Sequence, residues 1–387
     1  MQDRLCKVVR EAPPSPIREM FTAAEAYENV ISLGIGEPDF HTPEAVSRAA
    51  LADALAGHTH YTASQGDPEL RDLLAAYLNP KYGNGLSRED ILVSVGGMGA
   101  LVGFFKAVCD PGDEIIVPEP HFPAYRAMIA FSGGTMVNAT TRFEDGFVVR
   151  PEEIEKAITP RTKAILLNSP SNPTGAVIPG PALDQIAELA KRRDLLVLSD
   201  EVYDRLTFDG LPHDSIYNRP GMAERTLVVG SFSKAFAMTG WRLGWIFGPR
   251  PLINGILKVT TFYSSCPPSV SQRAAVAALK QPEEVWLAMT AAFQRRRDMA
   301  HEALSAMDGV SVNRPAGSFY IFPSLAGLTG DPSRFALDLL DQEQVVVVPG
   351  QGFGPSGASC VRLACTVDEK RLAQALEKIT RFCKKLR

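Results

Sequence analysis

The stretch SFSKAFAMTGWRLGW, residues 231–245, places one lysine among small, aromatic and apolar neighbours and an arginine eight positions later. Lys234 follows an apolar run, so we expect it at the end of a buried strand. Burial disfavours the charged form of an amine, and a neutral amine is the form that attacks an aldehyde to give a Schiff base. Ser231, Ser233 and Arg242 add hydroxyls and a planar guanidinium, which suit phosphate oxygens. A lysine alone is more often structural, so the rest of the chain has to decide.

Six further apolar runs accompany the run before this lysine, and helical segments lie between them. Continuous apolar runs, rather than alternating ones, are typical of strands buried on both faces of a parallel sheet. In residues 181–193, apolar side chains recur at helical spacing. The sequence therefore predicts an α/β fold with a mostly parallel seven-stranded sheet flanked by helices. The predicted strands are 91–95, 114–117, 136–140, 163–167, 195–199, 226–230 and 244–247.

Chemically distinct residues follow five of these strands. In open α/β sheets, ligands bind beyond the carboxyl ends of the strands, so these positions are the candidate site. They comprise a glycine turn that opens a helix, an aromatic face, an amide, a carboxylate with a phenol, and an amine. One ligand could contact them all. The residues are Gly97 and Met98, Phe122, Asn172, Asp200 with Tyr203, and Lys234.

Composition excludes several other classes of protein. The net charge of -4 and the pI near 5.9 do not favour nucleic acid as a partner. No apolar run approaches the roughly 18 residues that a membrane helix needs, and the amino terminus lacks the apolar region of a signal peptide, so we expect a cytoplasmic protein. The six cysteines form no CxxC pair and are predicted to be free thiols. No metal-ligand motif is present, and we expect no metal site.

Three motifs give the sequence a family resemblance. They are NPTG at residues 172–175, DxxY at residues 200–203, and SxSK ending at Lys234 with Arg242 eight residues later. With these motifs in this order, the sequence resembles the fold-type I pyridoxal-phosphate enzymes, and specifically the class I aminotransferases of the aspartate and aromatic branch. The likeness extends from about residue 32 to the last predicted helix.

The resemblance implies pyridoxal 5'-phosphate as the cofactor, carried by Lys234. Asp200 would keep the ring nitrogen protonated, and Tyr203 and Asn172 would hydrogen-bond the phenolate oxygen. Lys234, Asp200 and Tyr203 are thus the implied catalytic residues. The other implied cofactor contacts are Gly97, Met98, Phe122, Ser231, Ser233, Arg242 and Tyr61. The implied contacts to the substrate carboxylate are Gly34, Asn172 and Arg362.

The implied reaction moves the amino group of an L-amino acid to a 2-oxo acid such as 2-oxoglutarate by a ping-pong mechanism. The resemblance also implies a homodimer with active sites at the interface, where Tyr61 would reach the neighbouring cofactor phosphate. Met98 stands where some dicarboxylate-specific relatives have a basic residue, so aromatic and neutral donors are expected alongside aspartate. Ile17, Ile35 and Tyr263 are candidates for an apolar side-chain pocket.

Two alternatives remain open. A β-eliminating C–S lyase would use the same cofactor, and release of pyruvate and ammonia would identify it. A non-catalytic ligand-binding regulator would use the fold alone. The string GFGPSG at residues 352–357 suggests a nicotinamide site, but Pro355 blocks the helix that such a site needs, and no acidic residue follows at the required spacing.

Both chain ends are expected to contribute to a smaller α+β unit. We predict an amino-terminal arm over residues 1–42 that forms part of this unit, a large cofactor-binding domain over 43–285, and a small carboxyl-terminal domain over 286–387. The smaller unit would contain a long helix over residues 284–307.

Three local signals complete the predictions. Asp67 is expected to cap a helix that begins at Pro68. Thr366 and Glu369 are expected to form a capping box for the last helix. The three arginines at 295–297 are expected on a solvated helix face.

Overall fold

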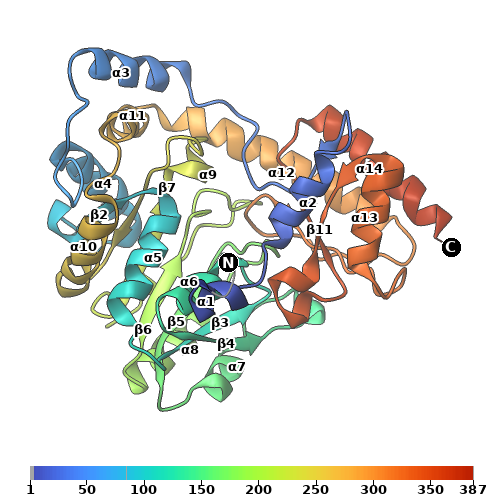
Figure 1. The fold of residues 1–387 in the computed structure, drawn as a ribbon, viewed down its shortest axis with the longest axis horizontal. Helices are drawn as coiled ribbons and strands as arrows, with labels where there is room; N and C mark the ends of the chain where they lie inside the picture. Colours follow the sequence, from blue (N-terminus) through green and yellow to red (C-terminus); the bar gives the residue numbers. More distant parts are fainter. Residues whose placement is uncertain (1–3, 84, 387) are drawn as a thin grey trace.

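A seven-stranded sheet forms the centre of the 387-residue chain in the computed structural model, which describes residues 4–83 and 85–386 (Figure 1). The strand order is β2-β8-β7-β6-β5-β3-β4, and only β8 runs antiparallel to its neighbours. The prediction of a mostly parallel seven-stranded sheet is confirmed. The strands are β2 (Ile91–Ser94), β3 (Glu114–Glu119), β4 (Thr135–Thr140), β5 (Thr162–Asn168), β6 (Leu196–Asp200), β7 (Thr226–Ser231) and β8 (Gly244–Phe247).

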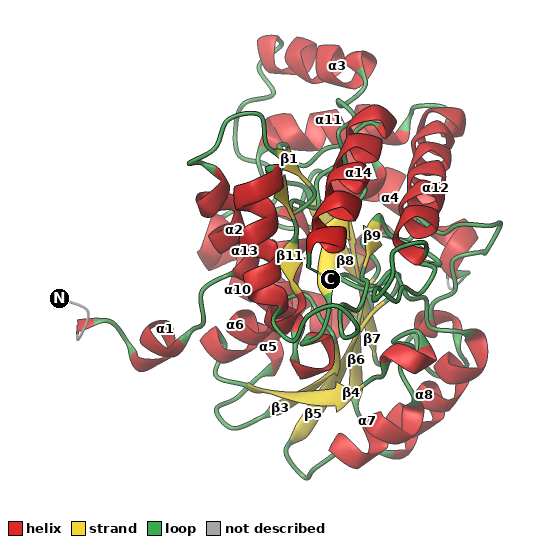
Figure 2. Ribbon diagram, turned by 90° about the vertical axis from the view of Figure 1, so that its right-hand side faces the viewer, coloured by secondary structure: helices red, strands yellow, loops and turns green. Residues whose placement is uncertain are grey.

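Helices cover both faces of this sheet (Figure 2). Successive strand residues point to opposite faces, so Ile115 and Val117 of β3 join one apolar cluster and Ile116 joins another. The first cluster contains side chains of α5 (Gly96–Val108), α6 (Ala124–Phe131) and α10 (Arg250–Ser264). The second contains side chains of α7 (Pro151–Ala157) and α8 (Gly180–Arg192). Burial on both faces explains why the strands are continuously apolar.

The helices surround the sheet and continue into both chain ends (Figure 1). They are α1 (Lys7–Glu11), α2 (Pro16–Ala24), α3 (Glu44–Leu55), α4 (Pro68–Tyr82), α5 (Gly96–Val108), α6 (Ala124–Phe131), α7 (Pro151–Ala157), α8 (Gly180–Arg192), α9 (Phe232–Ala235), α10 (Arg250–Ser264), α11 (Ser269–Leu279), α12 (Glu283–Ser305), α13 (Pro332–Glu343) and α14 (Glu369–Lys385).

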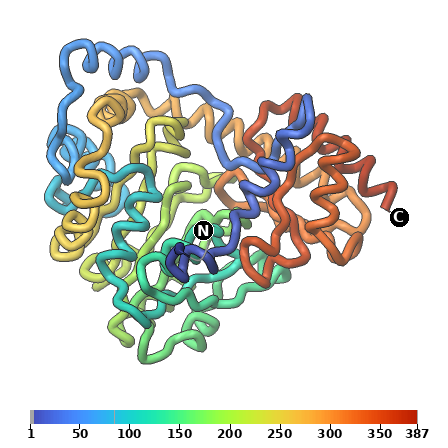
Figure 3. Tube along the Cα trace, viewed as in Figure 1, coloured from blue at the N-terminus to red at the C-terminus, as the bar shows by residue number. Residues whose placement is uncertain are grey.

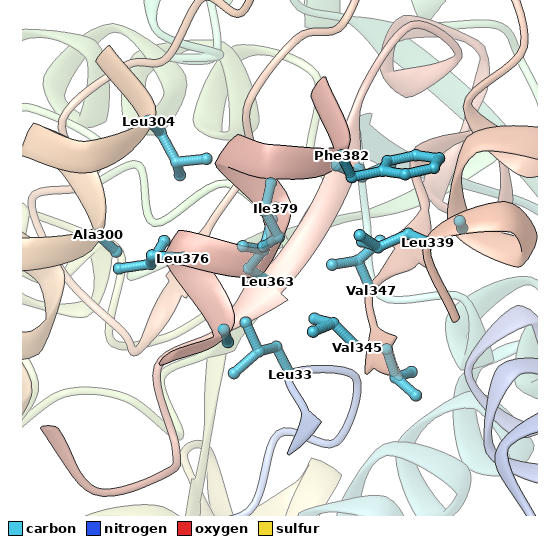
Figure 4. Close-up of a cluster of buried hydrophobic side chains, with 14 of the residues drawn as sticks. Leu33, Ala300, Leu304, Leu339, Val345, Val347, Leu363, Leu376, Ile379 and Phe382 are labelled. Atoms are coloured by element: carbon cyan, nitrogen blue, oxygen red, sulfur yellow. The ribbon is translucent and has the colours of Figure 1, made fainter. Parts of the chain in front are cut away.

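A second core joins the two ends of the chain. Met20, Ile31 and Leu33 pack in one cluster with side chains of α12, α13 and α14 (Figure 4). The amino-terminal segment accordingly runs beside the carboxyl-terminal part (Figure 3). Two small sheets belong to this part, one of β1 (Ile31–Ser32) with β10 (Val345–Val346), and one of β11 (Val348–Pro349), β12 (Val361–Ala364) and β9 (Tyr320–Ile321). This arrangement agrees with a smaller α+β unit built from both ends. The domain boundaries near residues 42 and 285 stay a prediction.

Two of the local signals can be compared with the observed helix caps. Asp67 accepts a hydrogen bond from the Glu69 amide at 2.8 Å and caps α4, as predicted. The predicted capping box at Thr366 and Glu369 is wrong. Asp368 caps α14 instead, since its carboxylate accepts from the Arg371 amide at 2.9 Å, while the Thr366 hydroxyl donates to the Ile35 carbonyl.

The prediction of a solvated face at residues 295–297 is wrong for two of the three arginines. Arg295 is exposed, whereas Arg296 and Arg297 are buried and form ion pairs with Asp39 and Asp209. Both buried arginines lie three and four positions after Phe293, so they share its inward stripe on α12.

Three further observations concern sites and segments that the sequence analysis considered. Residues 350–357 form two short 3-10 turns, η5 (Gly350–Phe353) and η6 (Pro355–Gly357), instead of the helix of a nicotinamide site. Within residues 4–83 and 85–386, no helix is long and apolar enough to cross a membrane. The same residues contain no group of three His, Cys, Asp or Glu side chains that could hold a metal ion.

Candidate active site

A cavity of about 330 Å³ lies at the carboxyl ends of β5, β6 and β7. Gly34 and Tyr61 do not line it: the Gly34 carbonyl accepts a hydrogen bond from Arg362, and the Tyr61 side chain is 89% exposed. Ile17 and Ile35 line the cavity and Tyr263 does not. The remaining predicted site residues all line it, namely Gly97, Met98, Phe122, Asn172, Asp200, Tyr203, Ser231, Ser233, Lys234, Arg242 and Arg362.

Lys234 lies on the short helix α9 directly after β7. The Ser231 hydroxyl caps this helix by accepting from the Ser233 amide at 3.1 Å, which fixes the turn that presents the lysine. Its Nζ donates to the Gly36 carbonyl at 2.5 Å. Burial lowers the pKa of Lys234 to about 8. A substantial fraction of this amine is therefore neutral near physiological pH.

Asp200 ends β6 and is buried. The Tyr125 hydroxyl donates to its Oδ2 at 2.6 Å, and the Val202 amide approaches Oδ1 at 3.4 Å. Burial raises the pKa of Asp200 to about 6, although the Tyr125 hydrogen bond acts to lower it. Over the described part of the chain, no lysine, arginine or histidine forms an ion pair with this carboxylate. The carboxylate is therefore available to a cationic group of a ligand.

Arg362 projects from β12 and is 1% exposed. Its guanidinium donates to the Asn172 Oδ1 at 3.0 Å and to the Gly34 carbonyl, and it stacks over the Tyr320 ring at 4.4 Å. Its Nε has no hydrogen-bond partner among the described residues, and none of their carboxylates pairs with it. A buried guanidinium that contacts only neutral oxygens is suited to a carboxylate ligand.

The start of α5 forms a candidate anion site. The first amides of a helix, here including Gly97 and Met98, have no acceptor within the helix. The Arg242 guanidinium lies against Gly96, where an added Cβ would stand 2.8 Å from Nη2. Arg242 also donates to the Thr239 carbonyl at 2.7 Å. A helix amino terminus beside a guanidinium is suited to phosphate oxygens, and a phosphate at this position stays a prediction.

The remaining polar residues face the same space. The Tyr203 hydroxyl donates to the Tyr320 hydroxyl at 3.3 Å. Burial, and then Tyr320, raises the pKa of Tyr203 well above its usual value, so this phenol stays protonated and can donate a hydrogen bond. The backbone N–H of Asn172 donates to the Asn168 Oδ1 at 2.8 Å. Phe122 packs edge-to-face on Tyr125.

Sequence reasoning missed several residues that contact this constellation, among them Tyr125, Asn168 and Tyr320. Tyr125 stands three positions after Phe122 around the start of α6, so the helical spacing gave a signal for it. Asn168 ends β5 and could have been included as a strand-end residue. Tyr320 comes from a segment whose approach to the sheet edge had no signal in the sequence. Gly36 was not missed: the glycines Gly34 and Gly36 suggest a close approach of a ligand to the backbone, and the Gly36 carbonyl accepts from Lys234.

The sheet and the cavity together define an α/β enzyme that presents an amine, a carboxylate and an anion site at one sheet edge. Residues 28–379 match the family model of aminotransferases of class I and II. The chain is 41% identical over 358 residues to an aspartate/prephenate aminotransferase of Thermus thermophilus, with 91% of each chain covered. It is 36% identical over 377 residues to aromatic-amino-acid aminotransferase 2 of Thermococcus litoralis, with 96% of each covered.

A solved structure shows the same fold. The aspartate aminotransferase of Thermus thermophilus with maleate superposes with a TM-score of 0.93 at 38% identity, covering 98% of this chain and 99% of the other. The chain therefore belongs to the class I aminotransferases and is a transferase that moves an amino group. The resemblance carried by the three motifs is confirmed. This family uses pyridoxal phosphate, and its substrates are amino acids and 2-oxo acids.

Proposed function

We propose that this chain binds pyridoxal 5'-phosphate in the cavity and transfers the amino group of an L-amino acid to a 2-oxo acid in ping-pong fashion. One observation carries the proposal: Lys234, Asp200 and Arg362 line one cavity, and no described side chain of opposite charge forms an ion pair with any of them. Burying unpaired charges is costly. A ligand with complementary groups would offset that cost.

The residues present fit this cofactor. The α5 amino terminus, Ser231, Ser233 and Arg242 would hold its phosphate. Asp200 would pair with the ring nitrogen, and Phe122 would pack on the ring. Tyr203 and Asn172 would hydrogen-bond the phenolate oxygen, as the family resemblance implies. When bound, the ring supplies an electron acceptor for the negative charge that develops at the substrate Cα.

The chain itself then has three tasks. Lys234, whose pKa lies near 8, would take the proton from Cα and return it, a contribution of roughly 10² to 10⁴ in rate. Arg362 would hold the α-carboxylate in a bidentate contact, with Asn172 and Gly34 fixing the guanidinium. The apolar wall that includes Ile17 and Ile35 would exclude water.

The cavity favours donors without a second carboxylate. Among the described residues that line it, the cations are Lys234, Arg242 and Arg362, and each already has a proposed task. Met98 contributes an apolar wall where a second carboxylate would need a base. Aromatic and neutral amino acids are therefore the proposed donors ahead of aspartate, with 2-oxoglutarate as an acceptor.

Exposed apolar side chains support the proposal of a homodimer. Large apolar residues on α3, on the loop that follows it and at the end of α10 face solvent in the single chain; they include Leu51, Leu55, Tyr61, Phe262 and Tyr263. Such surfaces mark association sites. A partner on this surface would bring its Tyr61 toward a neighbouring cavity. Sedimentation equilibrium should give a dimer, and a monomer at all concentrations would contradict this part.

A spectroscopic experiment tests the function. The purified protein with pyridoxal phosphate should show a visible band that is absent in Lys234→Ala, and the band should shift when a donor amino acid is added. Products should be a 2-oxo acid and, with 2-oxoglutarate present, glutamate. Pyruvate with ammonia would identify a lyase instead. A protein without any lysine-dependent band would refute the proposal.

A further inference from the structure

A second buried carboxylate lies directly behind the candidate site. Glu201 follows Asp200 at the end of β6, and successive residues of a strand point to opposite faces. Glu201 is 2% exposed and does not line the cavity. It accepts four hydrogen bonds, from Ser199 Oγ at 2.6 Å, Ser215 Oγ at 2.5 Å, His213 Nε2 at 2.5 Å and Tyr82 Oη at 2.8 Å. This degree of satisfaction fixes the carboxylate in one position.

His213 is the only one of these four donors that can carry a positive charge. Its side chain is largely buried, and its Nδ1 has no hydrogen-bond partner among the described residues. Burial acts to lower the pKa of His213, but Glu201 and then Asp204 outweigh burial and raise it. A proton on His213 would balance the charge of Glu201, which contacts its Nε2.

The other charged groups around this pair are already balanced. Lys81 of α4 forms an ion pair with Asp204 at 2.6 Å. On the loop before η4 (Ile216–Asn218), Asp214 pairs with Arg219. Loss of the proton from His213 would consequently leave one uncompensated negative charge on Glu201, next to Asp200. Glu201 already acts to raise the pKa of Asp200, after the larger effect of burial.

We propose that Glu201 and His213 are positioning residues for amino transfer. The pair fixes the end of β6, and the protonation state of His213 sets the net charge of the pair next to Asp200. This inference rests on the proposed role of Asp200 as the partner of the ring nitrogen. Neither residue lines the cavity, so both act through Asp200 and not on the substrate.

The first experiment uses the protein without cofactor, so its outcome does not depend on the proposed function. The chain has six histidines, which allows the titration of His213 to be followed by NMR with labelled histidine. Asp200→Asn removes a negative charge near the pair and should lower the pKa of His213 by about half a unit or more. Asp338→Asn, a carboxylate paired with Arg334 on α13, should leave it unchanged. An unchanged His213 in Asp200→Asn would overturn the proposal.

The second experiment follows the pH midpoint of the visible band in the holoenzyme. Glutamine can still donate a hydrogen bond to Glu201 but carries no charge, so His213→Gln should raise the midpoint. The double variant with Glu201→Gln should lose that rise, because the uncompensated charge is gone. A rise that persists in the double variant, or no rise in His213→Gln, contradicts the proposal.

A matched variant separates this effect from general destabilisation. Glu343 is also a buried carboxylate, paired with Arg381 and Lys385 in the carboxyl-terminal part. Glu343→Gln should leave the midpoint unchanged even where it lowers thermal stability. If Glu201→Gln fails to fold, His213→Gln and the NMR titration still decide. If no visible band forms, the proposed function fails, and the titration of His213 still tests the charge coupling.

Discussion

Arg297 and Arg362 are equally buried, at 1% exposure each, and have opposite surroundings. Arg297 on α12 forms a forked contact with both oxygens of Asp209, at 2.9 and 3.0 Å, and pairs with Asp298. Arg362 contacts an amide oxygen, a carbonyl and two aromatic rings. A buried charge without a counter-charge destabilises the free protein. The difference separates an arginine that holds the fold together from one that is suited to bind an anion.

Two lysines repeat this contrast. Lys81 donates to Asp204 at 2.6 Å, and that carboxylate overcomes burial and raises the pKa of the lysine. Lys234 donates only to a backbone carbonyl, and burial lowers its pKa to about 8. Lys234 and Arg362 beside the cavity thus form no ion pair with a described side chain, whereas Lys81 and Arg297 each pair with an aspartate. Substitution of Lys234 or Arg362 should therefore lower activity without lowering the stability of the cofactor-free protein. Substitution of Lys81 or Arg297 should lower stability.

Lys234→Met gives the largest expected effect. Activity should fall by about 10²- to 10⁴-fold, since the proposed proton carrier is lost. The cofactor-free protein should gain about 2 to 3 kcal/mol in unfolding free energy at neutral pH, because the wild-type amine is harder to protonate when folded. A folded pKa near 8 and an ordinary value of 10.5 set the window. The gain in unfolding free energy should be full below about pH 8, shrink between pH 8 and 10.5, and vanish above pH 10.5.

Denaturant unfolding of the apoprotein at several pH values measures this gain. Lys81→Met is the matched variant and should lose stability, because it leaves Asp204 buried without its partner. A loss of stability in both variants would break the contrast between the two lysines.

Arg362→Met and Arg297→Met form the next pair. Truncating a hydrogen-bonded buried cation that binds substrate costs about 2 to 5 kcal/mol, so kcat/KM of Arg362→Met should fall on the order of 10² to 10³-fold. Its apoprotein should be at least as stable as the wild type. Arg297→Met should instead lose about 1.5 to 3 kcal/mol of stability and keep its KM. Steady-state kinetics and denaturant unfolding of both variants decide, and an exchange of these outcomes would refute the assignment.

Tyr125→Phe should have a smaller effect. The hydroxyl acts to lower the pKa of Asp200, so its removal should raise that pKa further and move the acidic limb of the kcat/KM profile to higher pH. Because a hydrogen bond to a charged group contributes about 1.5 to 3 kcal/mol, loss of the Tyr125 hydroxyl should lower the rate by about 10- to 100-fold. Tyr27→Phe removes an exposed hydroxyl that donates to Asp341 and should leave the profile in place. Equal profiles for both variants would exclude Tyr125 as a partner of Asp200.

Arg295→Met should have the smallest effect. Its side chain is 63% exposed and pairs with Glu369, which is 44% exposed, so stability should change by less than about 1 kcal/mol. Arg295 and Arg297 lie two residues apart on α12. Thermal unfolding of Arg295→Met and Arg297→Met compares the loss of stability at an exposed and at a buried position of the same helix. A large loss of stability in Arg295→Met would show that exposure does not determine how much each arginine contributes to stability.

The sequence predicted the sheet well because its strands are buried on both faces. Such strands are continuously apolar, and β7 and β8 begin and end within one residue of their expected positions. Strand-end residues such as Asp200 and Asn172 could be grouped because parallel strands end at one edge. Partners separated widely along the chain could not be predicted. Nothing in the sequence connects Arg297 with Asp209, 88 positions away, or leaves Arg362 without an acid.

The pairing of Ile31 with Val345 has a consequence for synthesis of the chain. The first strand leaves the ribosome more than three hundred residues before its partner. Leu33 and Met20 therefore lack part of their final packing partners until α14 has been synthesised. The large sheet can assemble during that interval, because domains generally fold as units while translation continues. The segment that contains Met20 and Leu33 therefore reaches its final packing only after the carboxyl-terminal helices have been made.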